Sequence, residues 1–393
     1  MPLDTETMSQ LRKTVRRFVR EQLIPNERKV EENDQIPVEV LAEMRKLGLF
    51  GLTIPEQYGG LGLNTEEEAQ IIFEVAHASP AYRSCFASTI GIGSQGIVID
   101  GTPEQKQKYL PAMANGELVG SFALTEPDIG SDAAHLRLSA QRDGDHFILN
   151  GTKRFITNAP EAGLFTVLAR SDPKEAGAKG ITAFLVEAGT AGVRLGKIDR
   201  KLGHHGSHTS DVIFEDVRVP KSAIIGGQEG KGFATAMKVL DRGRLHITAA
   251  CCGAAERLIE MMIDYAVDRV QFGKPIAEHQ LVQGLIADSK RDSYVAWCAL
   301  IDACRRRDAG ERITTIAACV KYFASEMVWR VADAAVQVHG GNGYMQEYRV
   351  EQFLRDVRLY RLYEGTSQIQ QLIIARDLLK EHGRKSPSTR SKA

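Results

Sequence analysis

The chain is poor in net charge and in long apolar runs. Its 393 residues include 50 Lys and Arg and 50 Asp and Glu, so the formal net charge is zero. A neutral chain lacks the basic footprint of nucleic-acid-binding proteins and of proteins that lie on acidic membranes. No apolar run reaches the ~18 residues that a membrane-spanning helix needs. The sequence therefore predicts no nucleic-acid partner and no membrane partner.

Cysteine is scarce too, with six residues and no C-x-x-C pair. The histidines of "KLGHHGSHTS", residues 201–210, have no carboxylate or thiol at ligand spacing, so we expect no metal. Thiols in apolar helical surroundings are typical of buried cysteines in a reducing compartment. The N-terminal "MSQLRKTVRRFVREQL" is amphipathic and charged, unlike a signal peptide. We expect a cytoplasmic location in a bacterium, or the mitochondrial matrix in a eukaryote.

Hydrophobic periodicity divides the chain into three regions and predicts an α+β multidomain fold. Residues 1–118 repeat apolar positions at helical spacing, which indicates an N-terminal helical domain. Residues 119–230 hold short β-branched and aromatic runs between turn residues, typical of an antiparallel β domain. Residues 231–383 hold four long helical patterns with short connections, which predicts a four-helix bundle. Residues 384–393 form a polar tail.

Local signals add detail to this division. We expect Pro25 to end the first helix and Asn64 to cap the helix that begins after it. "RDGDHFILNG", residues 142–151, predicts a hairpin because an Asp-Gly turn joins two strand-like runs. Small residues around Gly253 would let its long helix pack closely against a neighbour.

Four segments have the residues of a ligand site, but each also has a plain structural explanation. The polar loop 121–132 could grip a ligand or form a turn set by proline and glycine. The aromatic strand 153–158 could lie on a planar cofactor or only pack its ring. Arg269, in segment 268–275, could bind a ligand or cap a helix. The glycines of 336–344 could approach a phosphate or end a helix.

"RLYRLYEGTSQIQ", residues 358–370, places a lone carboxylate, Glu364, where a helical pattern breaks. Gly365 follows it at once. One interpretation is a helix end with Gly365 as the C-terminal cap and Glu364 in water. The other is a general base held at the mouth of a pocket. The stretch alone leaves both open.

Six segments together, in this order, resemble the acyl-CoA dehydrogenase family over roughly residues 5–380. They are "LTEPDIGSDA", "NGTKRFITN", "FEDVRVP", "DRVQFGKPIAEHQ", "QVHGGNGYMQEYRVEQFLRD" and "YEGTSQIQ". The resemblance implies an FAD-dependent dehydrogenase of acyl-CoA thioesters, with an electron-transferring flavoprotein as electron acceptor. It also implies a homotetramer.

The resemblance assigns cofactor contacts one position at a time. Phe155 stands where the family commonly has Trp, and Arg269 and Phe272 match residues that reach FAD across a subunit interface. Residues 337–341 match a pyrophosphate-binding turn supplied by another subunit. The implied cofactor contacts are Phe122, Leu124, Thr125, Gly130, Ser131, Phe155, Ile156, Thr157, Arg269, Phe272, His279, Gln280, Gln337, Val338, His339, Gly340, Gly341, Thr366, Ser367 and Gln368.

The resemblance also identifies Glu364 as the base that takes the α-proton of the thioester, while a hydride passes from the β-carbon to flavin N5. The product would be a trans-2-enoyl-CoA. Burial can raise the pKa of such a carboxylate toward the operating pH. Some relatives carry the base on the helix that here reads "LDRGRL", but that position is Gly243. The implied substrate contacts are Arg83, Ser84, Ser131, Asp241, Arg244 and Gly365.

The acyl group stays open. "YRS" at residues 82–84 resembles the glutaryl-CoA dehydrogenase branch, whose Arg and Ser hold a distal carboxylate; here they would be Arg83 and Ser84. Arg83 could equally be a solvated or ion-paired side chain at a helix start. An acyl-CoA oxidase is a rival enzyme, and a catalytically silent assembly or nucleic-acid-binding relative is a rival of another class. The intact Glu364 and the neutral charge disfavour the silent relative.

Overall fold

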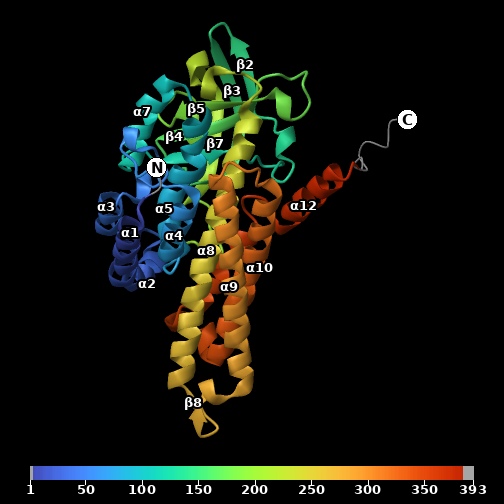
Figure 1. Ribbon diagram of the computed structural model, residues 1–393. Coiled ribbons are helices and arrows are strands. Elements are labelled where there is room, and N and C mark those ends of the chain that lie inside the picture. Colours follow the sequence, from blue (N-terminus) through green and yellow to red (C-terminus); the bar gives the residue numbers. More distant parts are fainter. Residues whose placement is uncertain (1–2, 384–393) are drawn as a thin grey trace. The chain divides into compact units, whose positions relative to one another are not determined.

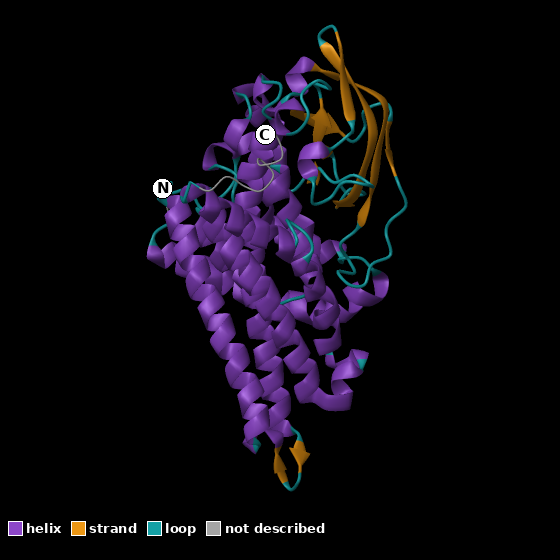
Figure 2. Ribbon diagram, turned by 90° about the vertical axis from the view of Figure 1, so that its right-hand side faces the viewer, coloured by secondary structure: helices purple, strands orange, loops and turns teal. Residues whose placement is uncertain are grey.

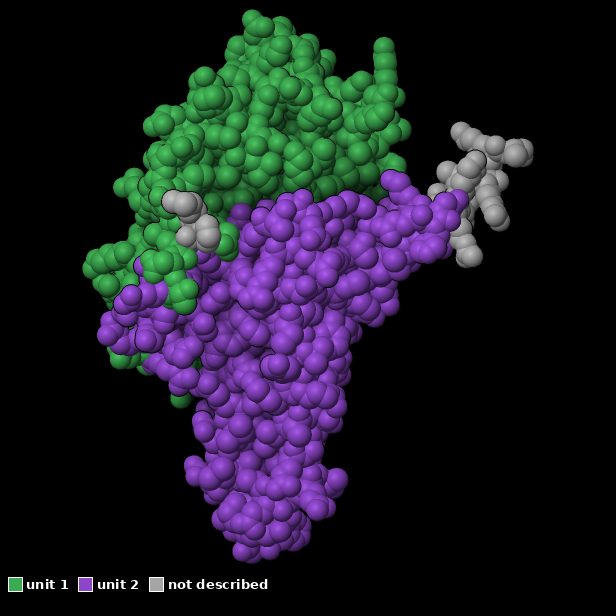
Figure 3. Space-filling model, viewed as in Figure 1, with its two compact units in different colours: residues 1–5, 21–64, 80–240 green, residues 6–20, 65–79, 241–393 purple. Residues whose placement is uncertain are grey.

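The computed structural model describes residues 3–383, so the predicted polar tail lies outside the described residues. The chain forms two compact units, each made of separate stretches of sequence (Figure 3). Unit 1 comprises Met1–Thr5, Glu21–Asn64 and Pro80–Leu240. Unit 2 comprises Glu6–Arg20, Thr65–Ser79 and Asp241–Ala393.

Unit 1 contains a seven-stranded sheet with the order β1-β4-β2-β3-β7-β6 and with β5 paired to β4. Most neighbours are antiparallel, as predicted, but β2 meets β4 in parallel at Ser139 and Arg170, and β1 pairs with β4 in parallel along its whole length. The β2–β3 hairpin lies between these two strands in the sequence and returns the chain to the starting edge, so the sheet is mixed. The strands are β1 (Gly120–Ala123), β2 (Ser139–Asp143), β3 (His146–Thr157), β4 (Leu164–Arg170), β5 (Ile181–Glu187), β6 (Val193–Leu195) and β7 (Thr209–Pro220) (Figure 2).

The predicted hairpin joins β2 and β3. Asp143 pairs with His146, so Gly144 and Asp145 alone make the connection. Gly144 has a φ of 58°, a left-handed conformation that glycine adopts without a steric cost. Alternate residues of β3, such as Phe147 and Leu149, are fully buried in the core of this sheet.

The helices of unit 1 follow their sequence signals with one exception. Thr102 caps α7 in a reciprocal capping box with Gln105. Pro25 does not end the helical run: α1 ends at Phe18, a π-helical turn spans Val19–Leu23, and Pro25 lies in the first turn of α2. A first-turn N–H makes no intrahelical bond, so proline fits there. The helices are α2 (Ile24–Asn33), α3 (Val38–Lys46), α5 (Pro80–Ser88), α6 (Gln95–Asp100) and α7 (Pro103–Ala114) (Figure 1).

Unit 2 is helical apart from a short hairpin. The last of the four predicted bundle helices forms α11 and the 3-10 segment Arg358–Arg361 before Glu364, and a further helix, α12, follows the turn. Helix α8 begins in unit 1 and continues through unit 2. The elements are α1 (Thr5–Phe18), α4 (Thr65–Val75), α8 (Gly232–Asp268), β8 (Val270–Gln271), β9 (Lys274–Pro275), α9 (Gln280–Asp308), α10 (Thr314–His339), α11 (Val350–Val357) and α12 (Ser367–Glu381).

Close packing joins α4 to α8 and α9 within unit 2. A Cβ on Gly253 would lie 2.8 Å from Cβ of Ala76, so glycine permits this approach. Helix α4 begins directly after Asn64, and the first amide groups, of Thr65 and Glu66, donate to the Asp308 carboxylate of α9 at 3.0 Å. A side chain distant in sequence therefore neutralises the positive end of α4.

No helix within residues 3–383 combines the length and the apolar character that crossing a membrane requires.

Candidate active site

In unit 1 the loop that follows β1 lies beside the end of β3. The Ser121 hydroxyl donates to the carbonyl of Thr157 at 2.8 Å. The Arg154 amide donates to the carbonyl of Thr125, also at 2.8 Å. The structure therefore brings the predicted loop 121–131 next to the predicted strand segment 155–157. In that loop Thr125 is half-buried and Ser131 is exposed, so both residues are accessible from the surface.

A buried ion pair between β3 and this loop stabilises the loop from the side of the protein core. Lys153 of β3 is fully buried, and its Nζ lies 2.8 Å from Glu126 Oε1 and 3.0 Å from the Leu124 carbonyl. The Glu126 carboxylate also accepts from the amides of Arg137 and Leu138, at 2.7 and 2.8 Å. Burial lowers the pKa of Lys153 to about 8, against the opposing effect of Glu126. The sequence motifs contain both residues but give no sign that they pair.

A bulge in β3 turns Phe155 outward. The register with β7 shifts between Lys153 and Ile156, and Phe155 has a φ of 58°. Its ring is 59% exposed, with the Arg154 guanidinium 4.7 Å from the ring centroid. Bulges commonly re-aim a side chain in this way next to functional sites. Ile156 instead belongs to the core, so position 156 offers a ligand only its backbone.

Helix α5 is tied to the end of β3 by Asn158. The Asn158 amide nitrogen donates to the carbonyl of Ser84 and to the hydroxyl of Ser88, both at 2.8 Å. Arg83 and Ser84, the predicted substrate contacts, are both buried, and Arg83 Nη2 lies 3.4 Å from Ser84 Oγ. Burial excludes the interpretation of Arg83 as a solvated side chain. Phe122 and Leu124 pack partly buried against the second apolar core of unit 1.

In unit 2 Glu364 lies in a tight turn between the 3-10 segment Arg358–Arg361 and α12. Glu364 has a φ of 52° and Gly365 a φ of 89°, two consecutive left-handed residues. A Cβ on Gly365 would lie 2.6 Å from Gln370 Nε2, so only glycine fits. Thr366 then starts α12, its hydroxyl accepting from the Ile369 amide at 3.2 Å. The turn therefore joins two helical segments, and Glu364 is not a helix end that points into solvent.

The Glu364 carboxylate lies over Gly243 of α8. A Cβ on Gly243 would lie 3.0 Å from Glu364 Cδ and closer still to Oε2, so the missing side chain makes room for the carboxylate. Arg244 is buried and pairs with Asp241, which also accepts from the Thr314 hydroxyl at 2.9 Å. Burial lowers the pKa of Arg244, whereas attraction to Asp241 and Glu364 raises it. Among residues 3–383, Arg244 Nε has no hydrogen-bond partner.

The β8–β9 hairpin carries further predicted cofactor residues of unit 2. Phe272 at its tip is 95% exposed with a φ of 55°, and Arg269 is exposed at its base. The His279 ring contacts the Phe272 ring edge-on, with centroids 5.9 Å apart, and exposed Gln280 begins α9. The hairpin thus presents an aromatic ring that no described residue covers.

The glycine cluster after α10 forms a tight 3-10 turn. Gly340 has φ 59° and ψ −138°, a conformation open only to glycine, and a Cβ on Gly340 or Gly341 would meet nothing within 4 Å. The His339 side chain already makes contacts within unit 2. Its ring stacks on Tyr265 with centroids 4.2 Å apart, and its Nδ1 lies 2.8 Å from the Ala335 carbonyl. The open space therefore lies over the two glycines. Of the remaining predicted residues here, Gln337 is exposed and Val338 is buried.

At the start of α12, one predicted hydroxyl, that of Ser367, is already hydrogen-bonded within the chain. Ser367 is buried, and its hydroxyl donates to Glu326 Oε1 at 2.6 Å. Arg361 donates to the same oxygen at 2.9 Å. Gln368 is exposed, and the Thr366 hydroxyl already caps the helix. We therefore expect Gln368 to be the side chain of this segment that is most available to a cofactor.

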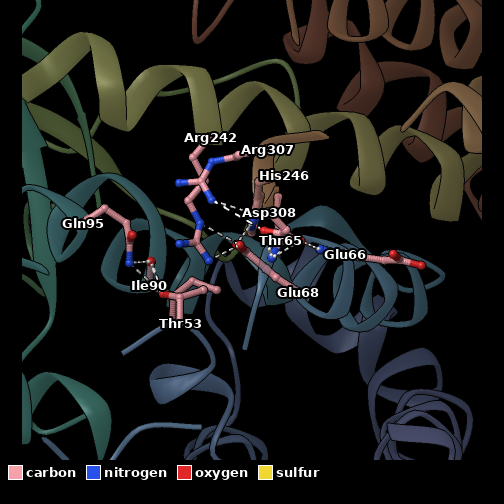
Figure 4. A network of polar contacts seen from close by, with 10 residues as sticks. All are labelled: Thr53, Thr65, Glu66, Glu68, Ile90, Gln95, Arg242, His246, Arg307 and Asp308. Carbon is pink, nitrogen blue, oxygen red and sulfur yellow. Dashed lines mark hydrogen bonds and ion pairs between the residues drawn. The ribbon is translucent and has the colours of Figure 1, made fainter. Parts of the chain in front are cut away.

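A buried charged network ties α8 to α4 beside Gly243 (Figure 4). Arg242 donates to Glu68 Oε2 through two nitrogens, at 2.9 and 2.6 Å, and His246 Nδ1 lies 3.0 Å from Glu68 Oε1. All three residues are buried. Burial alone would raise the pKa of Glu68, but the charge of Arg242 and the contact with His246 lower it to about 2. The network fixes the stretch of α8 that carries Gly243.

Residues 3–383 contain no group of three or more His, Cys, Asp or Glu side chains placed to hold a metal ion. Two of the three histidines in the loop 201–210 pair with carboxylates: His205 Nδ1 lies 2.8 Å from Glu31, and His208 contacts Glu161. A structural role accounts for both.

Three family models match the chain in succession. "Acyl-CoA dehydrogenase, N-terminal domain" matches residues 5–117, the middle domain matches 121–217, and the C-terminal domain matches 230–379.

Curated relatives cover almost the whole chain. A Bacillus subtilis acyl-CoA dehydrogenase is 40% identical over 375 residues, 95% of this chain and 98% of that protein. A Clostridium sporogenes 3-(aryl)acrylate reductase is 39% identical over 376 residues, 96% of this chain and 99% of that protein. The caffeyl-CoA reductase-Etf complex subunit CarC of Acetobacterium woodii is 39% identical over 380 residues, 96% and 99% of the two chains.

Solved structures agree in fold. The butyryl-CoA dehydrogenase of Megasphaera elsdenii has a TM-score of 0.92 at 34% identity and covers 96% of this chain and 100% of its own. The glutaryl-CoA dehydrogenase of Mycobacterium smegmatis has a TM-score of 0.89 at 32% identity, with 96% and 95% covered.

The Glu68 network predicts a specific acid dependence of stability. The pKa of Glu68 is about 2 in the folded protein and 4.5 when unperturbed, so its stabilisation is complete above pH 4.5 and declines as the pH falls toward 2. We expect the wild type to lose about 1 kcal/mol more than Glu68→Gln between pH 6 and pH 3.5, measured by urea unfolding. Glu66→Gln, which removes an exposed pair with Arg305, should behave like the wild type. Equal slopes for wild type and Glu68→Gln would contradict the assignment.

Proposed function

Because the chain belongs to the acyl-CoA dehydrogenase family, we propose that Glu364 is the catalytic base of an FAD-dependent α,β-dehydrogenation of acyl-CoA thioesters. The reaction class is oxidoreduction at a CH–CH bond. The observation that carries the proposal is the left-handed turn that lays the Glu364 carboxylate over the side-chain-free position Gly243. A carboxylate that only ended a helix would need no such space on a neighbouring helix.

The residues present fit FAD. An aromatic ring on a bulged strand, Phe155, is free to lie on a flat ring system, beside a loop in which Thr125 and Ser131 are accessible from the surface. In unit 2 the open glycines Gly340 and Gly341 let a backbone approach a phosphate closely. These residues, with Arg269, Gln280 and Gln368, would hold the cofactor. When bound, FAD supplies the acceptor for the hydride that leaves the β-carbon.

The residues of the chain itself manage the proton and the developing charge. The Glu364 carboxylate takes the proton from the α-carbon as the α-C–H bond breaks, and the Glu364 N–H donates to the thioester oxygen, which gains negative charge. Arg244 is buried beside Asp241, and its Nε has no hydrogen-bond partner among residues 3–383. The family resemblance would place it on the wall near the CoA end of the substrate.

The relatives are consistent with turnover in either direction and support a choice of redox partner. Because the same two transfers run in reverse when a 2-enoyl thioester is reduced, the acrylate and caffeyl-CoA reductases among the relatives are consistent with the same chemistry. We propose an electron-transferring flavoprotein as the redox partner, since CarC is named as part of an Etf complex. From the family resemblance we also propose a homotetramer, in which a second copy of the chain would cover the exposed Phe272. The bacterial relatives support a cytoplasmic location.

A second candidate substrate class is a dicarboxylyl-CoA such as glutaryl-CoA. The observation that favours it is Arg83, 4% exposed next to buried Ser84. A guanidinium can bind a carboxylate through two parallel hydrogen bonds, so the distal carboxylate of such a substrate would suit it. The solved glutaryl-CoA dehydrogenase among the structural neighbours is consistent with this class.

Replacing the base tests the main proposal. Glu364→Gln keeps the shape of the side chain but cannot accept a proton, so flavin reduction by acyl-CoA should slow by at least ~10²-fold while FAD stays bound. Anaerobic bleaching of the flavin, followed by stopped flow with a panel of acyl-CoAs, measures it. Bleaching at a near-normal rate would refute Glu364 as the base.

Filling the space under the carboxylate tests its placement. Gly243→Ala should displace the Glu364 carboxylate and slow flavin reduction by roughly 10²-fold, because a shift of about 1 Å in a catalytic group has that effect. The matched control is Gly284→Ala on α9, where a Cβ meets nothing within 4 Å. It should leave the rate unchanged and slightly stabilise the helix. Equal rates for both variants would show that the carboxylate does not need this space.

Arg83→Leu tests the second candidate. If Arg83 binds a distal carboxylate, the variant should lose about 10²-fold in kcat/KM for glutaryl-CoA and little for a straight-chain acyl-CoA. Side-by-side kinetics on the two substrates measure this selectivity. Unchanged activity on glutaryl-CoA would end the dicarboxylyl proposal without touching the role of Glu364.

A further inference from the structure

Two fully buried side chains hold the turn that carries Glu364. Lys321 of α10 donates from Nζ to the Gly365 carbonyl at 2.7 Å. Gln370 of α12 donates from Nε2 to the same carbonyl at 2.9 Å and to the Glu364 carbonyl at 3.2 Å. Both side chains are 0% exposed. All three of these hydrogen bonds end on the backbone of the turn.

This turn needs outside support. Consecutive left-handed residues leave their carbonyls outside any helix or strand, and a glutamate rarely adopts that conformation. The carbonyls of Glu364 and Gly365 point toward the buried donors, where water could not replace them. Removing Gln370 would take the donor from the Glu364 carbonyl, and removing either residue would leave the Gly365 carbonyl with one donor in place of two, so the turn would relax toward the ordinary helical conformation. The direction of the Glu364 side chain would change with it.

We propose that Lys321 and Gln370 are positioning residues, which hold the left-handed Glu364–Gly365 turn so that the carboxylate lies over Gly243 ready to take the α-proton. The inference rests on the proposed role of Glu364. It assigns a function to two residues that act on the base through the backbone that carries it.

The charges around Lys321 are consistent with a permanent structural donor. Burial lowers the pKa of Lys321 to about 8. The charge of Arg244 on α8 also lowers this pKa, whereas Cys251 on α8, Glu364 in the turn and Glu326 on α10 raise it. The ammonium therefore stays charged at neutral pH in spite of its complete burial. A charged donor makes a stronger bond to a carbonyl than a neutral one does.

The test separates proton abstraction from hydride transfer. An acyl-CoA analogue with sulfur at the β-position cannot lose a hydride, so exchange of its α-protons in D₂O, followed by NMR, reports the base alone. Lys321→Met and Gln370→Leu keep the side-chain volume and remove the donor. In FAD-loaded protein each should slow α-proton exchange about tenfold or more, with the dissociation constant of the analogue within about threefold of wild type. The double variant should be little slower than the slower single variant, because both act through one turn.

Matched controls and contrary outcomes are available in the same elements. Ser325→Ala removes a buried hydroxyl one turn along α10, and Gln371→Leu removes an exposed amide next to Gln370; both should exchange like the wild type. Normal exchange in Gln370→Leu would overturn the proposal even if Lys321→Met failed to fold. Weaker binding of the analogue with an unchanged exchange rate would also overturn it. Failure of the proposed function is distinct, since it appears as normal exchange in Glu364→Gln.

Discussion

The left-handed turn at Glu364 and Gly365 is the constraint on which the candidate site of unit 2 depends. Were these two residues helical, the 3-10 segment Arg358–Arg361 would lead directly into α12, and the carboxylate would follow the helix surface. The turn instead aims it at α8. Three nearby residues permit this direction of the carboxylate. Gly243 leaves space for it, Gly365 has no Cβ that would clash with Gln370, and Thr366 is the N-cap of α12.

Unit 1 meets a similar need in a similar way. Lys153 and Lys321 are each fully buried, each donates to a backbone carbonyl of an irregular segment, and each has a pKa that burial lowers to about 8. A loop whose hydroxyl or carboxylate groups must face a ligand cannot be stabilised by contacts on that ligand-facing side. A long side chain reaching from a rigid strand or helix holds it from the inner side and leaves the outer side open.

The sequence predicted those parts that depend on local pattern. The three-region division of helices and strands, the hairpin at Gly144, the long α8 and its close packing at Gly253 follow from periodicity and turn chemistry. The family resemblance, carried by six motifs, is confirmed by the family models and relatives. The individual cofactor and substrate contacts remain predictions.

What the sequence could not predict depends on residues far apart in the chain. The parallel pairing of β1 with β4 depends on where the β2–β3 hairpin folds back. The donation from Thr65 to Asp308 joins positions whose relation no local rule describes. The buried state of Lys153 and Lys321 is equally hidden, because a lysine in a helix or strand pattern is expected to be solvated. The prediction that Pro25 ends its helix is wrong because a π-helical turn precedes it.

The interleaving of the two units bears on how the chain is made. Helix α4 belongs to unit 2. Its Glu68 side chain pairs with Arg242 and His246, and its first amide groups donate to Asp308. These three partners emerge from the ribosome more than a hundred residues after α4. Until then α4 carries an unmet negative charge and an apolar face. During synthesis α4 is therefore exposed for a long interval before its packing partners have been made. In such an interval the exposed apolar surface of a nascent chain can bind chaperones.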